Sequence, residues 1–459
     1  MRHELEPYEV EIINVSPGTV ITSFEEKALS EEEHPGLCPI DSCNLPRFDM
    51  AIQILDAAVG PPGEVWPEGQ AKLNAPAAVV WPNFVERRLA PLRDKVSKKG
   101  PTAKRRWRLL QVESAIACNL RCVMCPWKKI STKAANHGIM TQEVWDSIRP
   151  HLQEVLSIDF SGGGEPLLQP KLVEWIRDAK AAGCEAGFLT NALLLKKEMA
   201  RKVIEAGIDW ICISMDGADA ELYERIRKGS SFQRVSENVK NIAELRNGKI
   251  PKTMINFVLM DINFHQVEGI VKLAARLGVD QVNFKHCDVI REEQGKGFGL
   301  FQLQETKAVR RMKKTLDKAR RLGKKLNVQT TAFSFTPHEK SVCDQDPRDS
   351  LFIRYDGTVA PCINLAFGGP TTFLGKEVTM ASVHYGRLPD QDLLELWETT
   401  TCKFYKQRFK DRVAAHEDSL IKSLMNGSSV SRERAEKIAL NAMPEPPQGC
   451  NVCHYLYDI

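Results

Sequence analysis

The sequence lacks a long hydrophobic run and a strong charge of either sign. No stretch approaches the roughly 18 apolar residues of a membrane span, and the first residues lack the apolar core of a secretory signal. The 63 Lys and Arg nearly balance the 59 Asp and Glu, leaving a formal net charge of +4. That charge is too small to argue for nucleic-acid binding. We therefore expect a cytoplasmic protein with neither membrane nor nucleic-acid partners.

The sequence also lacks the pattern of a disulfide framework. Its 13 cysteines are an odd number in a chain of 459 residues, whereas disulfide scaffolds are typically short and have an even count. Thiols kept reduced in the cytoplasm remain available to metals. The length allows two or three domains, or one barrel with appendages.

Three cysteines lie close together in a Cys-x3-Cys-x2-Cys arrangement, at Cys118, Cys122 and Cys125. A cubic [4Fe–4S] cluster needs four ligands, so three thiolates leave one iron open to a ligand that is not protein. Structural zinc is the alternative, but it usually takes four ligands arranged as Cys-x2-Cys pairs. The spacing favours the iron–sulfur cluster.

The chain divides into three predicted parts: an N-terminal extension (1–100), a central part (107–325) and a C-terminal part (326–459). The extension is rich in proline and acidic residues, with a short helical pattern at 47–59 and a hairpin pattern at 8–22. Its two cysteines, Cys38 and Cys43, are interpreted as free thiols. The basic run over 86–110 is interpreted as a solvated linker, with attraction of an acidic partner as the alternative.

The central part alternates short apolar strands with amphipathic helices, several of which end at a glycine. The predicted strands are 109–114, 157–161, 185–189, 210–214, 253–260 and 281–286. The predicted helices are 142–155, 171–182, 196–206, 232–247 and 264–277. Six βα repeats predict an α/β fold with a parallel sheet, which places ligand sites at the C-terminal ends of the strands. The three-cysteine run follows the first of these strands.

Residues 110–125 resemble the first strand and cluster loop of radical S-adenosylmethionine (SAM) enzymes. Residues 161–166, Ser-Gly-Gly-Gly-Glu-Pro, resemble the Gly-Gly-Glu-Pro motif after the second strand of that superfamily. Residues 189–192 are similar to its third-strand Thr-Asn-Gly signature, with Ala192 in place of the glycine. Residues 213–238 are similar to its fourth-strand segment. The resemblance implies a partial (β/α)6 TIM-like barrel.

The same resemblance implies a cofactor and its contacts. SAM would chelate the open iron through its amine and carboxylate, and an electron from the cluster would cleave it to a 5′-deoxyadenosyl radical. A flavodoxin- or ferredoxin-type protein would supply the electron. The residues implied in SAM binding are Met124, Gly163, Gly164, Glu165, Pro166, Asn191, Ser214 and Arg227. Met124 stands where the family usually has an aromatic residue.

Four further cysteines occupy the C-terminal part: Cys343, Cys362, Cys450 and Cys453. Four thiolates can ligate one complete [4Fe–4S] cluster, and a zinc site is the alternative. Their arrangement resembles the auxiliary-cluster modules called SPASM and twitch domains, and residues 388–409 resemble the helix that joins their halves. We expect one auxiliary cluster. The charged helical insert at 412–442 has no assigned counterpart.

Cys287 lies at the end of the sixth predicted strand. Related epimerases return a hydrogen atom from a cysteine thiol, so Cys287 is a candidate donor; a buried core thiol is the simpler interpretation. Three functional hypotheses follow. The chain is a radical SAM enzyme that modifies a ribosomally made peptide by crosslink, thioether or epimerisation, or one that dehydrogenates or epimerises a small molecule such as an amino sugar. The third hypothesis is a non-catalytic iron–sulfur electron-transfer protein.

Overall fold

The computed structural model describes residues 14–15, 64–65, 105–248, 250–287, 291, 298–300, 306–425 and 432–459. The chain forms two compact units, Met1–Ala103 and Lys104–Ile459. In the first unit, β1 (Asn14–Val15) pairs in parallel with β2 (Glu64–Val65). The predicted helix at 47–59 and both N-terminal cysteines lie outside the described residues, as does the predicted hairpin except for β1.

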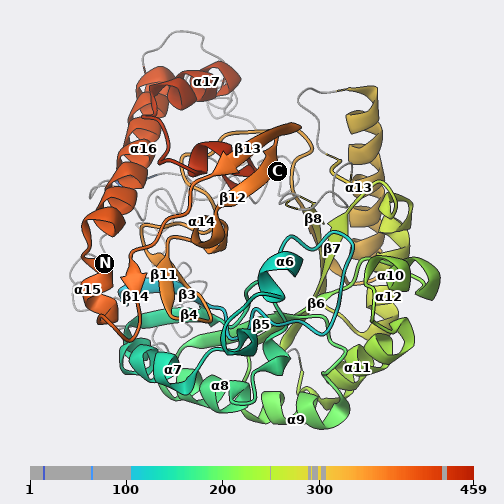
Figure 1. The fold of residues 1–459 in the computed structure, drawn as a ribbon. Helices are drawn as coiled ribbons and strands as arrows, with labels where there is room; N and C mark the ends of the chain where they lie inside the picture. Colours follow the sequence, from blue (N-terminus) through green and yellow to red (C-terminus); the bar gives the residue numbers. More distant parts are fainter. Residues whose placement is uncertain are drawn as a thin grey trace, which may run out of the picture. The chain divides into compact units, whose positions relative to one another are not determined.

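A ten-stranded sheet forms the centre of the second unit (Figure 1), in the order β14-β11-β10-β3-β4-β5-β6-β7-β8-β9. The strands from β10 to β9 pair in parallel, and β11 and β14 extend the sheet in antiparallel fashion. Their bounds are β3 Trp107–Val112, β4 Val155–Asp159, β5 Glu185–Thr190, β6 Trp210–Ser214, β7 Lys252–Leu259, β8 Gln281–His286, β9 Gln329–Ala332, β10 Ser350–Ile353, β11 Thr358–Ala360 and β14 Gly386–Arg387. The sheet begins at β14 and ends at β9 rather than closing on itself, as expected of a partial barrel.

All six predicted strands are present, and those at 210–214 and 281–286 have the predicted bounds. Two parallel strands that the sequence did not predict join the sheet. β10 has four residues, all buried, and pairs with β3. β9 is half exposed and pairs with β8. Both are short, and their pairing depends on tertiary contacts rather than on a repeating pattern.

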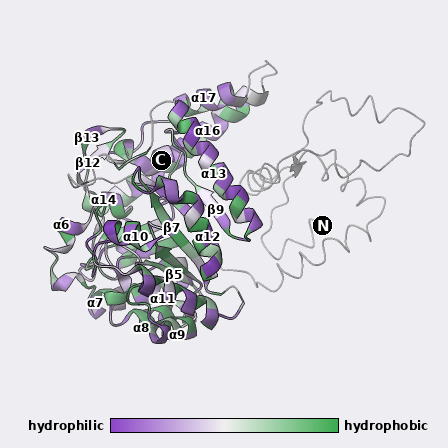
Figure 2. Ribbon diagram, turned by 90° about the vertical axis from the view of Figure 1, so that its right-hand side faces the viewer, coloured by the Kyte–Doolittle hydropathy of each residue, from purple (hydrophilic) through white to green (hydrophobic). Residues whose placement is uncertain are grey.

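Helices cover the outside of the sheet (Figure 1). They are α7 Gln142–Ile148, α8 Leu172–Ala181, α9 Lys197–Glu205, α10 Ala220–Ile226, α11 Phe232–Leu245, α12 Val267–Leu277 and α13 Lys307–Lys325. In α8 the buried residues Leu172, Trp175, Ile176 and Ala179 recur at helical spacing and face the core. Figure 2 shows that apolar residues predominate in the strands inside, whereas polar residues lie on the outer faces of the helices. The predicted helix at 142–155 ends at Ile148, and a 3-10 turn containing Pro150 follows because proline interrupts the α-helical hydrogen bonds.

The C-terminal part continues the same compact unit. The short helix α14 (Ile363–Phe367) is followed by a hairpin of β12 (Gly369–Phe373) and β13 (Lys376–Met380). The predicted joining helix is present as α15 (Leu393–Trp397) and the start of α16 (Thr400–Met425). The insert at 412–442 forms the rest of α16 together with α17 (Arg432–Ala442), and the two helices pack against each other.

Asp392 and Glu395 form a capping box at the start of α15. In the described part of the chain, no helix has the length and apolar character of a membrane span.

Candidate functional site

The loop after β3 carries the first three cysteines, all of them half-buried. Two backbone hydrogen bonds fix this loop against the segment that follows α10: the Arg121 amide donates to the Lys228 carbonyl at 2.9 Å, and the Val123 amide to the Ile226 carbonyl at 3.0 Å. The loop is therefore held by the strand before it and by a segment more than a hundred residues away.

Burial raises the pKa of the Cys118, Cys122 and Cys125 thiols, that of Cys122 to about 12. Arg227 opposes this effect, because its Nη1 lies 3.8 Å from the Cys122 sulfur and its charge favours the thiolate. Since metal binding requires thiolates, the buried positive charge suits a ligand role. Cys118 and Cys125 also line a small cavity together with Trp127 and Gly163.

The glycine run after β4 lies directly on the cysteine loop. A side chain on Gly164 would place its Cβ 2.3 Å from the carbonyl oxygen of Ala117, and one on Gly163 would stand 2.3 Å from Ile116. The Glu165 amide also donates to the Ala117 carbonyl at 2.8 Å. Gly164 is therefore required for this close approach of two backbones, whereas a Cβ on Gly163 would meet the side chains of Ile116 and Trp127.

Gly164→Ala is expected to destabilise the protein by about 2 kcal/mol and to weaken SAM binding, because the added methyl group meets backbone rather than a movable side chain. Thermal unfolding and SAM titration would measure the two effects. Gly269→Ala is the control: it lies within α12, where its Cβ would approach only the Ala218 side chain at 3.1 Å. Equal effects of the two substitutions would contradict the close-approach argument.

Glu165 is buried and joins the loops after β4 and β5. Its carboxylate accepts hydrogen bonds from the Thr190 hydroxyl at 2.7 Å, the Asn191 amide at 2.8 Å and the Leu167 amide at 3.2 Å. Burial raises its pKa to about 6, against the effect of these donors. Both carboxylate oxygens therefore have partners within the protein. A contact of Glu165 or Pro166 with SAM stays a prediction.

Asn191 reaches back to the cysteine loop, where its side-chain amide donates to Asn119 at 2.8 Å and lies 4.0 Å from the Cys118 sulfur. The next residue, Ala192, has a φ of +59°. This left-handed conformation favours glycine and explains why the family signature has glycine at this position. Asn238 of α11 holds the turn through a 2.8 Å hydrogen bond to the Ala192 carbonyl.

Arg227 is buried in an ion pair with Asp216, at 2.6 Å between Nη2 and Oδ2. Asp216 follows β6 and accepts a 2.7 Å hydrogen bond from the Val258 amide. The structure thus places Arg227 beside both Cys122 and an internal acid, while its Nε has no hydrogen-bond partner among the described residues. Sequence reasoning missed Asp216, although it lies in the same motif as Ser214.

Met124 and Cys287 belong to one small apolar cluster, which also contains Met260 and Ile226. Cys287 is 4% exposed. The predicted hydrogen donor therefore lies on the same side of the barrel as the cysteine loop, within an apolar environment. Its position agrees with the interpretation as a core thiol and leaves the donor role a prediction.

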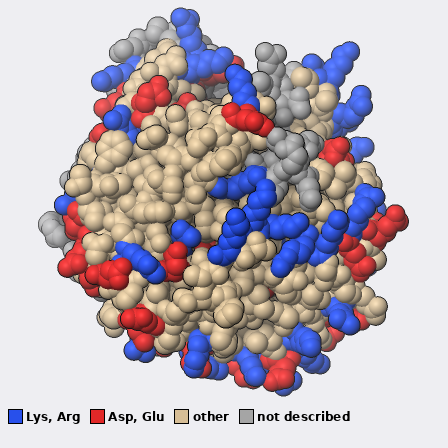
Figure 3. Space-filling view, viewed as in Figure 1, with Lys and Arg blue, Asp and Glu red and all other residues tan. Residues whose placement is uncertain are grey.

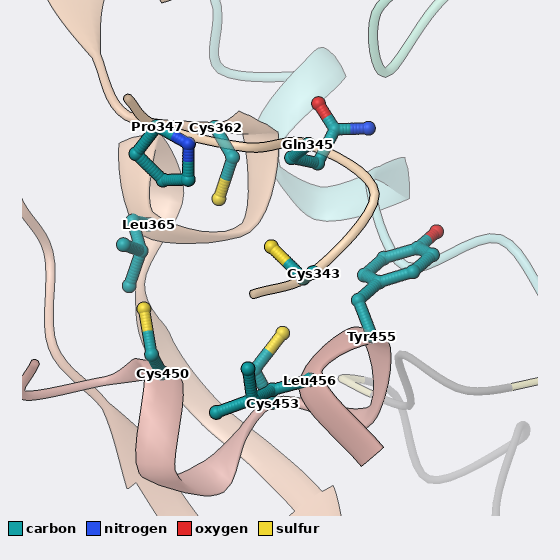
Figure 4. A pocket seen from close by; sticks show the side chains of 9 residues that line it. All are labelled: Cys343, Gln345, Pro347, Cys362, Leu365, Cys450, Cys453, Tyr455 and Leu456. Atoms are coloured by element: carbon teal, nitrogen blue, oxygen red, sulfur yellow. The ribbon is translucent and has the colours of Figure 1, made fainter. Parts of the chain in front are cut away.

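The four C-terminal cysteines come together around one cavity. Figure 4 shows the sulfur atoms of Cys343, Cys362, Cys450 and Cys453 pointing toward the same space. Burial raises the pKa of the first three of these thiols. Among the described residues, no three His, Cys, Asp or Glu side chains are grouped as a single metal ion would require.

Arg412 of α16 holds the chain segments that lead to this site. Its buried guanidinium donates to the Ser341 carbonyl at 3.1 Å, to the Lys340 carbonyl at 3.1 Å and to the Glu339 carboxylate at 2.7 Å. It also donates to the carbonyl of Pro444. These partners precede Cys343 and Cys450 in the chain, so the insert positions two segments of the four-cysteine site. Sequence reasoning found no role for this arginine.

Glu113 connects the two cysteine sites. This fully buried residue follows β3 and accepts hydrogen bonds from the Gly163 amide at 2.8 Å and the Tyr355 amide at 3.3 Å. Burial raises its pKa to about 7. One carboxyl group thus ties the glycine run to the turn that precedes Cys362.

Glu113→Gln is expected to make stability less dependent on pH. An unfolded Glu ionises near its ordinary pKa of about 4.3, whereas folded Glu113 keeps its proton to about pH 7. Stability therefore falls as the pH rises from about 4.3 to 7, by roughly 3–4 kcal/mol, and then levels off. Urea unfolding at pH 5 to 8 would measure the slope. Glu198→Gln, on an exposed side chain, is the control; an unchanged slope in Glu113→Gln would contradict the assignment.

Two domain families match the chain. Residues 112–274 match the radical SAM superfamily, and residues 343–422 match the SPASM iron–sulfur cluster-binding domain. The chain therefore carries a radical SAM domain followed by a SPASM domain, as its motifs indicated. These domains bind [4Fe–4S] clusters and SAM. The SPASM match ends before Cys450, and the structure brings that cysteine and Cys453 to the same cavity.

Curated relatives resemble this chain over different lengths. The tungsten-containing aldehyde ferredoxin oxidoreductase cofactor-modifying protein of Pyrococcus furiosus is 24% identical over 308 residues, which is 65% of this chain and 82% of the relative. The AdoMet-dependent heme synthase of Methanosarcina barkeri is 32% identical over 176 residues, 37% of this chain and 48% of the relative. The GTP 3′,8-cyclase of Peptoclostridium acidaminophilum is 31% identical over 179 residues, 38% of this chain and 54% of the relative. The chain thus spans about half the length of the last two.

Among solved structures, native anSMEcpe with bound AdoMet is similar, with a TM-score of 0.50 at 18% identity over 66% of this chain and 83% of that chain. This likeness concerns the fold and agrees with the partial barrel. The seven cysteines fit the two groups that the domains imply: three half-buried thiols follow a strand of the barrel beside a buried arginine, and four further thiols share a cavity.

Proposed function

We propose that this protein is a radical SAM enzyme that removes a hydrogen atom from its substrate and completes the reaction as a net oxidation. The observation that carries the proposal is the presence, in one compact unit, of a three-thiol site beside the family's SAM-binding loops and a separate four-thiol cavity. When bound, the cluster and SAM supply the 5′-deoxyadenosyl radical. The residues of this chain bind, orient and shield these groups.

The three-cysteine loop is suited to leave one iron open for the amine and carboxylate of SAM. The glycine run brings exposed backbone to the loop without intervening side chains. Asn191 and Arg227 approach the sulfurs of Cys118 and Cys122 and provide polar surroundings on two sides. Met124 contributes an apolar surface for adenine.

The four-cysteine site supplies a complete set of protein ligands. A cluster with four thiolates offers no open iron to the substrate, so its suitable role is to accept an electron from a substrate radical. That role supports the net oxidation proposed above. Burial of the surrounding side chains lowers the local dielectric and keeps water away.

For the substrate we propose a ribosomally made peptide, in which a crosslink or thioether forms as the net oxidation; epimerisation of a residue, which is redox-neutral, is the alternative outcome. The support is analogy with other proteins of this two-domain architecture. A small molecule is the second candidate, and the names of the curated relatives favour it, since they refer to a cofactor-modifying protein, a heme synthase and a GTP cyclase. Motif matches on separate strands argue against a non-catalytic electron-transfer protein.

The proposed electron donor is an acidic flavodoxin- or ferredoxin-type protein. Arg121 and Lys129 are exposed on and just after the cysteine loop. Lys129 belongs to α6 (Lys128–Ser131), and Figure 3 shows Lys and Arg side chains gathered across the middle of this face. Positive charge near the loop would steer an acidic partner toward it. Cytoplasmic localisation belongs to the same proposal.

Anaerobic reduction of the fully loaded protein with dithionite tests the proposed function. We expect methionine and 5′-deoxyadenosine to accumulate when SAM is added, as measured by mass spectrometry. If protein with both clusters loaded failed to cleave SAM, both enzyme candidates would be excluded and the electron-transfer alternative favoured. With candidate substrates, a loss of two hydrogen atoms in the product would support the oxidation.

A further inference from the structure

Arg291 lies between the two cysteine sites. It follows β8, and its guanidinium stands over the Trp127 ring, 5.0 Å from the ring centroid. Its Nη1 donates a hydrogen bond to the carbonyl of Gly368. Trp127 comes two residues after Cys125, and Gly368 directly follows α14, whose N-cap is Cys362. Arg291 therefore contacts both the three-cysteine loop and the segment that follows a cysteine of the four-cysteine cavity.

Two donors of this guanidinium are unused. Nε and Nη2 are buried and have no hydrogen-bond partner in the described part of the chain. A buried cation without a partner is costly, and such a group in a native protein calls for a ligand. Burial also lowers the pKa of Arg291 to about 10, and no neighbouring carboxylate among the described residues offsets it.

The two unused donors lie on the same edge of the guanidinium. Their N–H bonds run parallel and match two oxygens of one carboxylate or phosphate group, the bidentate geometry that favours arginine at oxyanion sites. The ring of Trp127 supports the plane of the group, and the Gly368 carbonyl fixes its opposite edge. The fork is thus held in place before a ligand arrives.

Gly368 itself is conformationally restricted. Its φ of +53° and ψ of −149° belong to a region that only glycine readily adopts, and an added Cβ would stand 2.6 Å from the Ser382 amide nitrogen. This backbone turns the Gly368 carbonyl toward Arg291.

A second arginine provides the comparison. Trp127 contacts Phe367, with ring centroids 4.8 Å apart, and Arg354 stands over the other ring, 4.5 Å from the Phe367 centroid. Arg354 has an acid partner, since its Nη2 lies 3.2 Å from Asp356. Two arginines therefore lie over neighbouring aromatic rings, and of these two it is Arg291 whose charge has no acid beside it among the described residues.

We propose that Arg291 anchors the substrate by binding an oxyanion, a carboxylate or phosphate group, side-on through Nε and Nη2. The inference deepens the proposed function, because it assumes that the anion belongs to the molecule on which the radical acts. It predicts a substrate with an anionic group placed between the two cysteine sites.

Thermal unfolding of the cluster-loaded protein in chloride, acetate and phosphate at equal ionic strength tests the proposal with simple probes. Followed by circular dichroism, the parent protein is expected to unfold about 2 °C higher in acetate or phosphate than in chloride, because a ligand that binds only the folded state stabilises it. Arg291→Gln and Arg291→Lys should lose this difference, since neither side chain has the fork. Arg354→Gln, the matched control, should keep it.

The comparison between variants removes the general stabilising effect of phosphate on proteins. A larger rise in acetate would identify a carboxylate, and a larger rise in phosphate a phosphoryl group. Equal rises in the parent and in both Arg291 variants, or no rise in the parent, would overturn the proposal. So would a large drop of the Arg291→Gln midpoint in chloride, because the arginine would then be structural.

A final arm adds SAM to the parent and to Arg291→Gln. We expect SAM to raise the midpoint of both alike, and a rise confined to the parent would assign the fork to SAM and overturn the proposal. The proposed function is tested separately by SAM cleavage. A parent protein that binds oxyanions but never cleaves SAM would refute the proposed function while leaving the anion site standing.

Discussion

Replacing Cys122 with alanine is expected to lower 5′-deoxyadenosine formation by at least about 100-fold, to the background of the assay, because the SAM-binding cluster would keep two of its three protein ligands. Arg227 lies 3.8 Å from the Cys122 sulfur, and its charge favours the Cys122 thiolate. The iron content should fall by about four atoms per chain. Iron analysis and product quantification after dithionite reduction measure both effects.

Cys212→Ala is the matched control for this experiment. Cys212 is also a buried cysteine, with its pKa raised by burial to about 12, but it lies within β6 rather than in the cysteine loop. The control should keep its iron and its activity. If Cys122→Ala retained cleavage with a full iron complement, the assignment of the three-cysteine loop would be wrong.

Replacing Cys450 with alanine is expected to stop product formation while 5′-deoxyadenosine still appears. This cysteine lines the four-thiol cavity, away from the loop that holds the other cluster. Its loss should again remove about four iron atoms, and the substrate radical would then lack its electron acceptor. Mass spectrometry of both the nucleoside and the substrate separates the two steps.

Cys402→Ala is the matched control here. Cys402 lies in α16, is fully buried and is not among the residues that line the cavity. This variant should keep both clusters and form product. If Cys122→Ala and Cys450→Ala showed the same loss of SAM cleavage, the proposed division of roles between the two sites would fail.

The sequence predicted the parts of the molecule that depend on local pattern. Alternation of apolar strands and amphipathic helices located the six central strands, because each βα unit carries its own periodicity. The cysteine spacing and the glycine run indicated the two loops of the proposed SAM site, because those loops need particular residue types at fixed offsets. Cys450 and Cys453 were also assigned from sequence, and the cavity that they share with Cys343 and Cys362 agrees with that assignment.

The features of the fold and of the candidate site that were not predicted depend on contacts between segments distant in the chain. Such contacts produce no pattern in the local sequence. The pairing of β10 with β3 joins residues more than two hundred positions apart. Arg412 looks like any charged residue of a helix, and its four protein partners become visible only in the fold. The roles of Asp216 and Glu113 likewise follow from their burial, which the local sequence does not show. Arg291 is the clearest example, because two of its guanidinium donors lack hydrogen-bond partners among the described residues, and only the fold shows this.

The four-cysteine cavity has a consequence for how the chain assembles. Cys343 and Cys453 lie at opposite ends of a segment that includes α14, α15, α16 and α17. A cluster bound to both ends is a covalent crosslink that closes a loop of about 100 residues, and such a crosslink restricts the unfolded chain by roughly 4–5 kcal/mol. Cluster binding would therefore stabilise the folded state of this region. Protein made under iron limitation should expose α16 and α17 to proteases first.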